Sequence, residues 1–266
     1  MTGVPDTAWS DVVPGVTRCQ EVRRHAVRSR SAIGRFPVKV ERFTVELDGF
    51  ATPVTAERQT PARRRGAPVL LTPGAGGDLD DDGLVALATV LAELGHTVVR
   101  ANLPHNETRR RPPKAERSTG AYRQLLAGVA ARVDADRSWI VGGKSYGGRV
   151  ASMAVAGGMT AAALLLYGYP LHPPGKPEQL RVGHWPAIAV PCLFLQGERD
   201  TFSSPELLAE CVHKLPRRPA VVVVPGGDHS LHVTGRASAD GTPSNPPTTI
   251  ASLRDELRNW LAGLDG

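Results

Sequence analysis

The stretch that decides the fold is WIVGGKSYG, residues 139–147. It opens with a short apolar strand, and the apolar spacing of residues 145–156 predicts a helix directly after it. Gly143 and Gly147 flank Ser145 in the pattern G-x-S-x-G, which predicts a strand–turn–helix too tight for side chains on either flank. Such a turn lifts the serine hydroxyl above the sheet edge, where the helix N-terminus favours developing negative charge. The pentapeptide alone also fits a plain glycine turn between a strand and a helix.

Short apolar strands and helices alternate on both sides of this stretch. Strands are predicted at residues 69–71, 97–101, 139–141, 162–167, 192–195 and 220–224, and helices at residues 84–94, 117–133, 145–156, 205–215 and 250–261. This alternation indicates an α/β domain with a mostly parallel sheet and helices on both faces. Residues 38–47 alternate apolar and polar side chains, and a second strand follows the Asp48-Gly49 turn at residues 51–56. We expect this N-terminal hairpin to form the antiparallel edge of the sheet.

The positive charge of the chain is concentrated near its beginning. The 266 residues carry 32 Lys+Arg against 26 Asp+Glu, and most of the excess lies before residue 67. A basic arm can bind nucleic acid or a membrane surface, but this one has little aromatic interleaving and no nucleic-acid motif. We therefore expect residues 1–37 to form a basic, flexible arm and no nucleic acid to be bound. Residues 38–266 are predicted to form a single domain.

Cysteine usage and hydropathy favour a cytoplasmic setting. Cys19, Cys192 and Cys211 are odd in number and widely spaced, which suits neither a disulfide framework nor a zinc site. No run of about 18 apolar residues is present, so we expect no membrane span. The start lacks a basic segment followed by an apolar one, so no secretory signal is predicted.

A serine nucleophile needs a base, and the base needs an acid that orients it. Asp200 and His229 each lie just past the end of a predicted core strand. The carboxyl ends of parallel strands meet at one edge of the sheet, where ligand sites gather. The chain order Ser145, Asp200, His229 is the order expected for a serine nucleophile of this context. These three residues are therefore our candidate catalytic set.

Neighbouring polar residues leave alternatives open. Glu198 could replace Asp200 as the acid, and His232 could replace His229 as the base. Asp228 is expected to shape the turn beside His229. The remaining candidates among the histidines are expected in loops or on the surface: His96, His105, His172, His184 and His213. No His/Asp/Cys cluster has metal-ligand spacing, so no metal or cofactor is expected.

An oxyanion would be stabilised by two backbone N–H groups. We expect one from Tyr146, the residue after the serine, and one from Ala75 in the glycine turn at residues 73–77. That turn also fits a plain glycine-rich connection. Gly-Lys-Ser at residues 143–145 superficially suggests a phosphate loop, but the upstream glycine of such a loop is missing.

Four segments occur in series: GGKSYGGR at residues 142–149, YPLHPPGKP at 169–177, LFLQG at 193–197 leading to Asp200, and GDHS at 227–230. Together they resemble the small α/β-hydrolase-fold proteins of the NSL-complex-subunit-3/testis-expressed type, near dienelactone hydrolase. The resemblance covers about residues 68–262. It implies the α/β-hydrolase fold and the Ser145–Asp200–His229 triad, but no particular substrate.

The sequence departs from that family at two positions. Many relatives carry His where Pro73 stands and Met where Tyr146 stands. Backbone amides perform the oxyanion work, so Pro73 alone should not abolish catalysis. Tyr146 is expected to narrow the acyl pocket.

The segment at residues 168–187 replaces the large helical cap found on many lipases, and we expect it to form a small lid. Tyr169 and His172 of this segment are candidate substrate contacts. Arg109 and Arg149 could attract an anionic substrate, although a solvated basic loop is the simpler interpretation of Arg109.

These observations predict a serine hydrolase that cleaves a carboxylic ester or thioester of a small-molecule acyl substrate through an acyl-enzyme. Two alternatives remain open. The first is a non-catalytic binding or scaffold module, since a fold does not determine a function. The second is an acyltransferase, because hydrolysis and acyl transfer share the same acyl-enzyme. The sequence does not indicate the oligomeric state.

Overall fold

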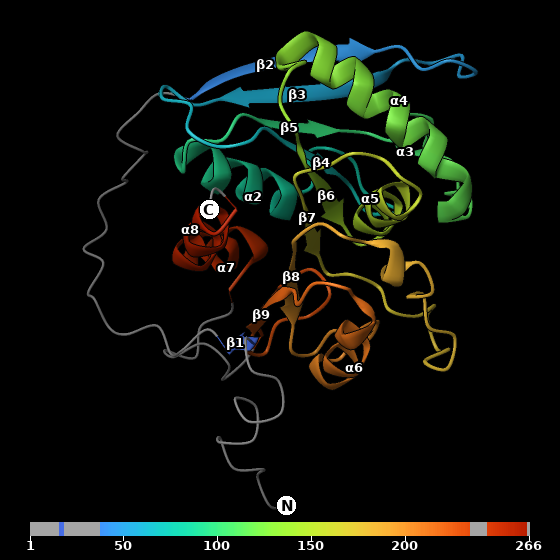
Figure 1. Ribbon diagram of the computed structural model, residues 1–266, viewed down its shortest axis with the longest axis vertical. Coiled ribbons are helices and arrows are strands. Elements are labelled where there is room, and N and C mark those ends of the chain that lie inside the picture. Colours follow the sequence, from blue (N-terminus) through green and yellow to red (C-terminus); the bar gives the residue numbers. More distant parts are fainter. Residues whose placement is uncertain (1–15, 19–37, 235–243, 265–266) are drawn as a thin grey trace, which may run out of the picture.

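The computed structural model describes residues 16–18, 38–234 and 244–264. The strands form one sheet in the order β1-β9-β8-β7-β6-β4-β5-β3-β2, with helices on both faces (Figure 1). The strands are β1 (Val16–Arg18), β2 (Lys39–Val45), β3 (Val54–Thr60), β4 (Val69–Thr72), β5 (Val98–Ala101), β6 (Ile140–Lys144), β7 (Ala163–Tyr167), β8 (Cys192–Gly197) and β9 (Ala220–Val224). The helices are α2 (Asp82–Glu93), α3 (Pro104–Glu107), α4 (Ala115–Val133), α5 (Tyr146–Ala156), α6 (Pro205–Cys211), α7 (Pro246–Ser252) and α8 (Arg254–Ala262), with 3-10 turns η1 (Trp185–Ala187) and η2 (Val212–Lys214).

The sheet is mostly parallel, as the alternation of strands and helices predicts. Strands β4 to β9 pair in parallel with one another, whereas β3 pairs antiparallel with both β2 and β5. The predicted antiparallel hairpin at the N-terminal side of the domain is therefore confirmed. Every carboxyl end of the parallel strands faces the same edge of the sheet, and this arrangement determines where loop residues can meet.

The second hairpin strand lies further along the chain than the sequence predicts. Strand β3 runs from Val54 to Thr60, through polar residues that we expected partly in a loop. Glu57 of this strand is buried and forms an ion pair with the equally buried Arg100 of β5. A buried carboxylate is tolerated here because a guanidinium from the adjacent strand pairs with it.

Each central strand separates two apolar layers. In β7, Leu164 and Leu166 belong to the layer that includes residues of α4, α5 and α6. Leu165 and Tyr167 belong to the opposite layer, which includes residues of α2, α7 and α8 (Figure 1). Strands buried on both faces are apolar throughout, which explains the run ALLLY in this strand.

The ends of α2 agree with the sequence signals. The Asp81 side chain caps the helix by accepting hydrogen bonds from the backbone N–H groups of Gly83 and Leu84. Gly95 follows the helix with a φ of 103°, a left-handed conformation that favours glycine.

Other helices differ from the expectation. The segment predicted as one helix at residues 205–215 is α6 followed by the 3-10 turn η2. The final predicted helix is divided at Leu253 into α7 and α8, and α7 begins upstream of residue 250 because Asn245 caps it and proline occupies its first turn. The short helix α3, which also begins with proline, lies where no element was predicted.

Part of the predicted N-terminal arm belongs to the sheet. Residues Val16–Arg18 form β1 and pair in parallel with Val221–Val223 of β9. The expectation of a flexible arm is therefore wrong for these three residues, because the exposed edge of β9 offers backbone partners that a sequence pattern does not reveal. The rest of the arm, residues 1–15 and 19–37, lies outside the described residues.

Gly142 of β6 should be intolerant of any side chain. A Cβ at this position would lie 1.8 Å from the backbone oxygen of Leu165 on β7. We expect Gly142→Ala to lower the free energy of unfolding by about 1–3 kcal/mol or more, because the two strands would have to separate. Urea denaturation measures the change.

Gly120 provides the matched control, because a Cβ at this position in α4 meets nothing within 4 Å. Gly120→Ala should raise stability by about 0.5–1 kcal/mol through helix propensity. Equal effects of the two substitutions would contradict the proposed steric cause.

Candidate active site

Ser145 occupies the turn between β6 and α5 in a strained conformation. Its φ is 50° and its ψ is −111°. Such backbone angles cost a non-glycine residue about 1–3 kcal/mol and persist only where the surroundings impose them. Here the backbone oxygen of Thr72 lies 2.1 Å from a Cβ built on Gly143 and 2.4 Å from one built on Gly147. Glycine is therefore required on both sides of the serine.

His229 and Asp200 form a continuous hydrogen-bonded chain with Ser145. His229 Nε2 lies 2.9 Å from Ser145 Oγ, and His229 Nδ1 lies 2.7 Å from Asp200 Oδ2. The Asp200 side chain is fully buried, whereas 22% of the His229 side chain is exposed. The structure thus brings the three candidate catalytic residues together with a buried acid and an accessible base.

The carboxylate of Asp200 is held by further donors. Its Oδ1 accepts a hydrogen bond from the backbone N–H of Phe202 at 2.8 Å, and its Oδ2 accepts one from Gln196 Nε2 at 2.6 Å. The ring of Phe202 also lies 4.6 Å from the ring of His229, centroid to centroid. Sequence reasoning missed Gln196 and Phe202, because no local pattern shows which neighbours of an acid will turn toward it.

The alternative acid and base have other partners. Glu198 Oε2 accepts a hydrogen bond from the backbone N–H of Gly226 at 2.7 Å. His232 lies beside Asp228, and both side chains are about half exposed. Asp228 also accepts the backbone N–H groups of Ser230 and His232, which agrees with its expected place in the turn.

The glycine turn after β4 lies next to the serine. A Cβ on Gly74 would be 3.7 Å from Ser145 Cβ, and Ala75, the next residue, is exposed to solvent. Lys144, the residue before the serine, forms an ion pair of 2.7 Å with Asp81, the N-cap of α2. The two ends of the segment from Gly74 to Asp81 are thus both in contact with the β6–α5 turn.

Tyr146 connects the start of α5 to the segment before α4. Its hydroxyl donates to the backbone oxygen of Pro113 at 2.9 Å and shares a hydrogen bond of 2.8 Å with Ser118 Oγ. Burial raises the pKa of this phenol above its ordinary value, so the group stays neutral. The side chain therefore acts as a tether between α5 and α4.

Tyr169 and His172, the two candidate substrate contacts after β7, are both buried. Tyr169 is 1% exposed, packs edge-on against Trp185 and donates its hydroxyl to the backbone oxygen of Arg181. His172 is also buried, with Nδ1 2.8 Å from the backbone oxygen of Pro173. Both side chains therefore pack within the protein, and their role as substrate contacts stays a prediction.

The two arginines also differ from one another. Arg149 on α5 forms an ion pair of 2.8 Å with Glu116 on α4, so its charge is already matched. Arg109 is exposed and has a φ of 50°. Arg109 is thus the more accessible of the two charges, and attraction of an anionic substrate by either arginine stays a prediction.

The segment between β7 and β8 contains no large helical cap among its described residues. Its only regular element there is η1, and His184 of this segment lies 2.8 Å from Ser152 Oγ on α5. Burial, and next the nearby Arg149, lower the pKa of His184 to about 4, so the imidazole is neutral at ordinary pH. The role of the segment as a lid stays a prediction.

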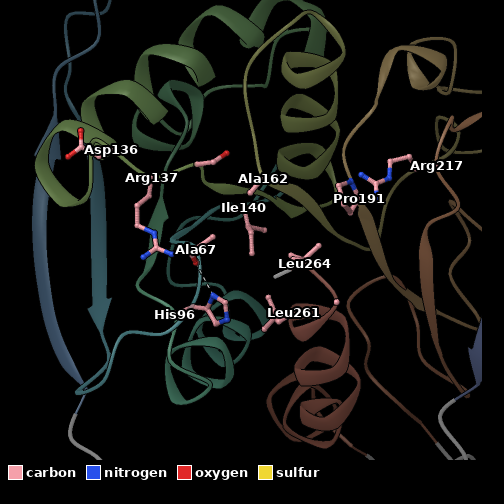
Figure 2. A pocket seen from close by; sticks show the side chains of 12 residues that line it. Ala67, His96, Asp136, Arg137, Ile140, Ala162, Pro191, Arg217, Leu261 and Leu264 are labelled. Carbon is pink, nitrogen blue, oxygen red and sulfur yellow. Dashed lines mark hydrogen bonds between the residues drawn. The ribbon is translucent and has the colours of Figure 1, made fainter. Parts of the chain in front are cut away.

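No group of three or more His, Cys, Asp or Glu side chains within the described residues could hold a metal ion. A cavity of about 620 Å³ lies elsewhere, at the amino ends of the parallel strands (Figure 2). Ile140 at the start of β6 lines it, together with Arg137, Arg217 and the buried His96. It shares no lining residue with the Ser145 site at the opposite edge of the sheet.

Comparison with known proteins gives this arrangement a family. A family model described as an alpha/beta hydrolase domain matches residues 65–256, most of the chain. The chain belongs to this alpha/beta hydrolase family. The predicted α/β-hydrolase fold is therefore confirmed. Membership of this family supports hydrolase activity. The finer likeness to the NSL-complex-subunit-3 type stays a prediction.

Solved structures of other alpha/beta hydrolases share the fold. An alpha-beta serine hydrolase homologue from Coxiella burnetii is 18% identical, with a TM-score of 0.64, over 82% of this chain and 96% of its own. Dienelactone hydrolase from Anabaena variabilis is 14% identical, with a TM-score of 0.65, over 85% and 98%. A serine hydrolase without lid from Xanthomonas campestris is 22% identical, with a TM-score of 0.58, over 85% and 97%.

The position of His229 should depend on Gly168. This glycine follows β7 with a φ of 57°, and a Cβ on it would lie 2.6 Å from the backbone oxygen of His229. We expect Gly168→Ala to displace the imidazole and to slow labelling of Ser145 by a fluorophosphonate at least ~10-fold, because the serine loses a positioned base. The labelling rate is measured by mass spectrometry.

Gly175 serves as the control, since its φ of 67° is equally left-handed but a Cβ there meets nothing within 4 Å. Gly175→Ala imposes the same backbone strain and should label at the wild-type rate. If fluorophosphonate labelling slows equally in both variants, backbone strain causes the effect. That result would contradict a steric clash between a Cβ at residue 168 and His229.

Proposed function

We propose that this alpha/beta hydrolase is a serine hydrolase that cleaves a carboxylic ester or thioester through an acyl-enzyme. The observation that carries the proposal is the hydrogen-bonded chain from Ser145 Oγ through His229 to Asp200, with distances of 2.9 and 2.7 Å. A serine hydroxyl is a weak nucleophile unless a base within this range removes its proton.

In the proposed reaction Ser145 Oγ attacks the carbonyl carbon of the substrate and His229 Nε2 takes the hydroxyl proton. The carbon–oxygen double bond opens to an oxyanion, which the backbone N–H groups of Ala75 and Tyr146 would stabilise. When the intermediate collapses, the alcohol or thiol leaves with the proton from His229. Water, activated by the same imidazole, then hydrolyses the acyl-enzyme and restores the serine.

Asp200 would determine the tautomer of the base. A carboxylate accepts a hydrogen bond from Nδ1–H, so the lone pair of the imidazole is on Nε2, the nitrogen that faces Ser145. The bonds from Phe202 and Gln196 keep that carboxylate in place. The proposed steps use only protein groups and water.

The substrate we propose is a small acyl compound. Ser145 is partly exposed, and no large cap covers the described part of the chain. The resemblance in fold to dienelactone hydrolase supports ester cleavage as the reaction class. The exposed Arg109 would favour substrates that carry a negative charge away from the acyl carbon.

We also propose a reducing compartment such as the cytoplasm. The two described cysteines, Cys192 and Cys211, are free and buried thiols. Burial raises the pKa of Cys192 to about 12, so this thiol is protonated and unreactive. Among the described residues, no helix is long and apolar enough to cross a membrane.

Labelling with a fluorophosphonate tests the proposal without a known substrate. We expect the label on Ser145, none in Ser145→Ala, and a loss of at least ~1,000-fold in labelling rate in His229→Ala, because the base is removed. Hydrolysis of p-nitrophenyl and thioester panels should fall in parallel. Ser138→Ala, at an exposed serine that lines the cavity at the opposite edge of the sheet, is the control and should leave both readouts unchanged.

Folded wild-type protein that takes no label and cleaves no ester would contradict the proposal and favour a scaffold function. Products formed with added alcohol or amine in preference to water would instead identify an acyltransferase.

A further inference from the structure

Helix α3 contacts the glycine turn that would supply an oxyanion donor. Asn106 of this helix donates from Nδ2 to the backbone oxygen of Gly74 at 3.1 Å and to that of Gly77 at 2.8 Å. Its Oδ1 accepts the backbone N–H of Leu103 at 3.0 Å, which fixes the amide relative to its own helix. The side chain is buried, so these bonds form away from water and do not compete with it.

These bonds determine the orientation of one particular peptide group. The oxygen of Gly74 and the N–H of Ala75 belong to the same planar, trans peptide, so they point in opposite directions. Because Asn106 holds the oxygen toward α3, the Ala75 N–H points away from α3. Gly74 itself is adjacent to Ser145, with 3.7 Å from a Cβ on the glycine to Ser145 Cβ. The peptide that carries the candidate donor is thus both near the serine and fixed in orientation.

His105 supports the same turn from the neighbouring position of α3. Its imidazole is buried, interacts with the backbone of Ala75, and lies edge-on to the Tyr146 ring with centroids 5.0 Å apart. Burial lowers the pKa of this histidine, so the ring is neutral. One helical turn therefore contacts both residues whose N–H groups would stabilise the oxyanion. His105 was expected in a loop or on the surface, and the structure corrects that expectation.

The glycine turn is costly to order on its own. Gly74, Gly76 and Gly77 have wide conformational freedom, and ordering them costs more backbone entropy than ordering other residues. We propose that Asn106 is a positioning residue that holds the Ala75 N–H in the orientation required for an oxyanion. This inference rests on the proposed serine hydrolase function.

A positioning role affects the transition state more than the bound substrate. The negative charge on the carbonyl oxygen develops only as Ser145 attacks, so a misdirected donor raises the barrier and leaves substrate binding nearly unchanged. Loss of one oxyanion donor costs about 100- to 1,000-fold in kcat, and partial misplacement costs less. We therefore expect kcat to fall by about 10- to 100-fold when Asn106 loses its donor, with KM within about threefold of the wild type.

Two substitutions separate the possible causes. Asn106→Asp keeps the acceptor for Leu103 and the shape of the side chain, but it replaces the donor to Gly74 and Gly77 with a carboxylate oxygen. Asn106→Ala removes both groups without adding charge. Thr108→Val is the control for α3 itself, because the Thr108 hydroxyl donates a hydrogen bond to the backbone oxygen of Pro104 in the same helix.

The experiment measures Tm, kcat and KM for a p-nitrophenyl ester, and inhibition by a trifluoromethyl ketone, which forms an oxyanion with an active serine. Both Asn106 variants should lower kcat and weaken inhibition by the ketone in proportion, with KM little changed. Thr108→Val should keep wild-type kinetics.

Unchanged kcat in folded Asn106→Ala would overturn the inference, as would a loss in Thr108→Val equal to that in the Asn106 variants. If wild-type protein takes no fluorophosphonate label at Ser145, the proposed function itself fails. If the wild type is active and the Asn106 variants match it, only the positioning role fails.

Discussion

The close approach of the β6–α5 turn to the end of β4 is the constraint on which the candidate site depends. The backbone oxygen of Thr72 occupies the space that a side chain on Gly143 or Gly147 would need. Only glycine allows this approach, and the approach holds Ser145 at a φ of 50°. The chain leaving β4 then runs directly past the serine, so the position of Ser145 and that of the glycine turn follow from one packing contact.

The parallel sheet brings the candidate acid and the candidate base to that serine. Asp200 follows β8 and His229 follows β9, two strands that pair directly. Ser145 follows β6, and β7 lies between β6 and β8. The chain after β7 must therefore leave room for His229. Gly168 does so, because a Cβ there would lie 2.6 Å from the backbone oxygen of His229. Ser145 and His229, 84 positions apart in the sequence, come within hydrogen-bonding distance because of this strand order.

Polar contacts inside the protein determine the shape of the loops more than they contribute net stability. The Lys144–Asp81 ion pair joins the serine turn to the start of α2, and Gln196 holds the carboxylate of Asp200. Asn106 connects the glycine turn to α3. Buried polar pairs of this kind gain little net free energy, since desolvation offsets their attraction. Their contribution is to select one arrangement of irregular backbone, which apolar packing does not specify.

The sequence by itself determined the fold class, because apolar strands buried on both faces and glycine-flanked turns follow from local patterns such as ALLLY in β7 and G-x-S-x-G at Ser145. Positions just past core strands, together with chain order, also made Asp200 and His229 the preferred partners for that serine over Glu198 and His232. Tertiary structure decided what depends on distant neighbours: the pairing of Val16–Arg18 with β9, the burial of Glu57 against Arg100, and the contacts of Asn106 with the glycine turn. Local propensity carries no information about these contacts, because each is made between segments that only the folded sheet brings together.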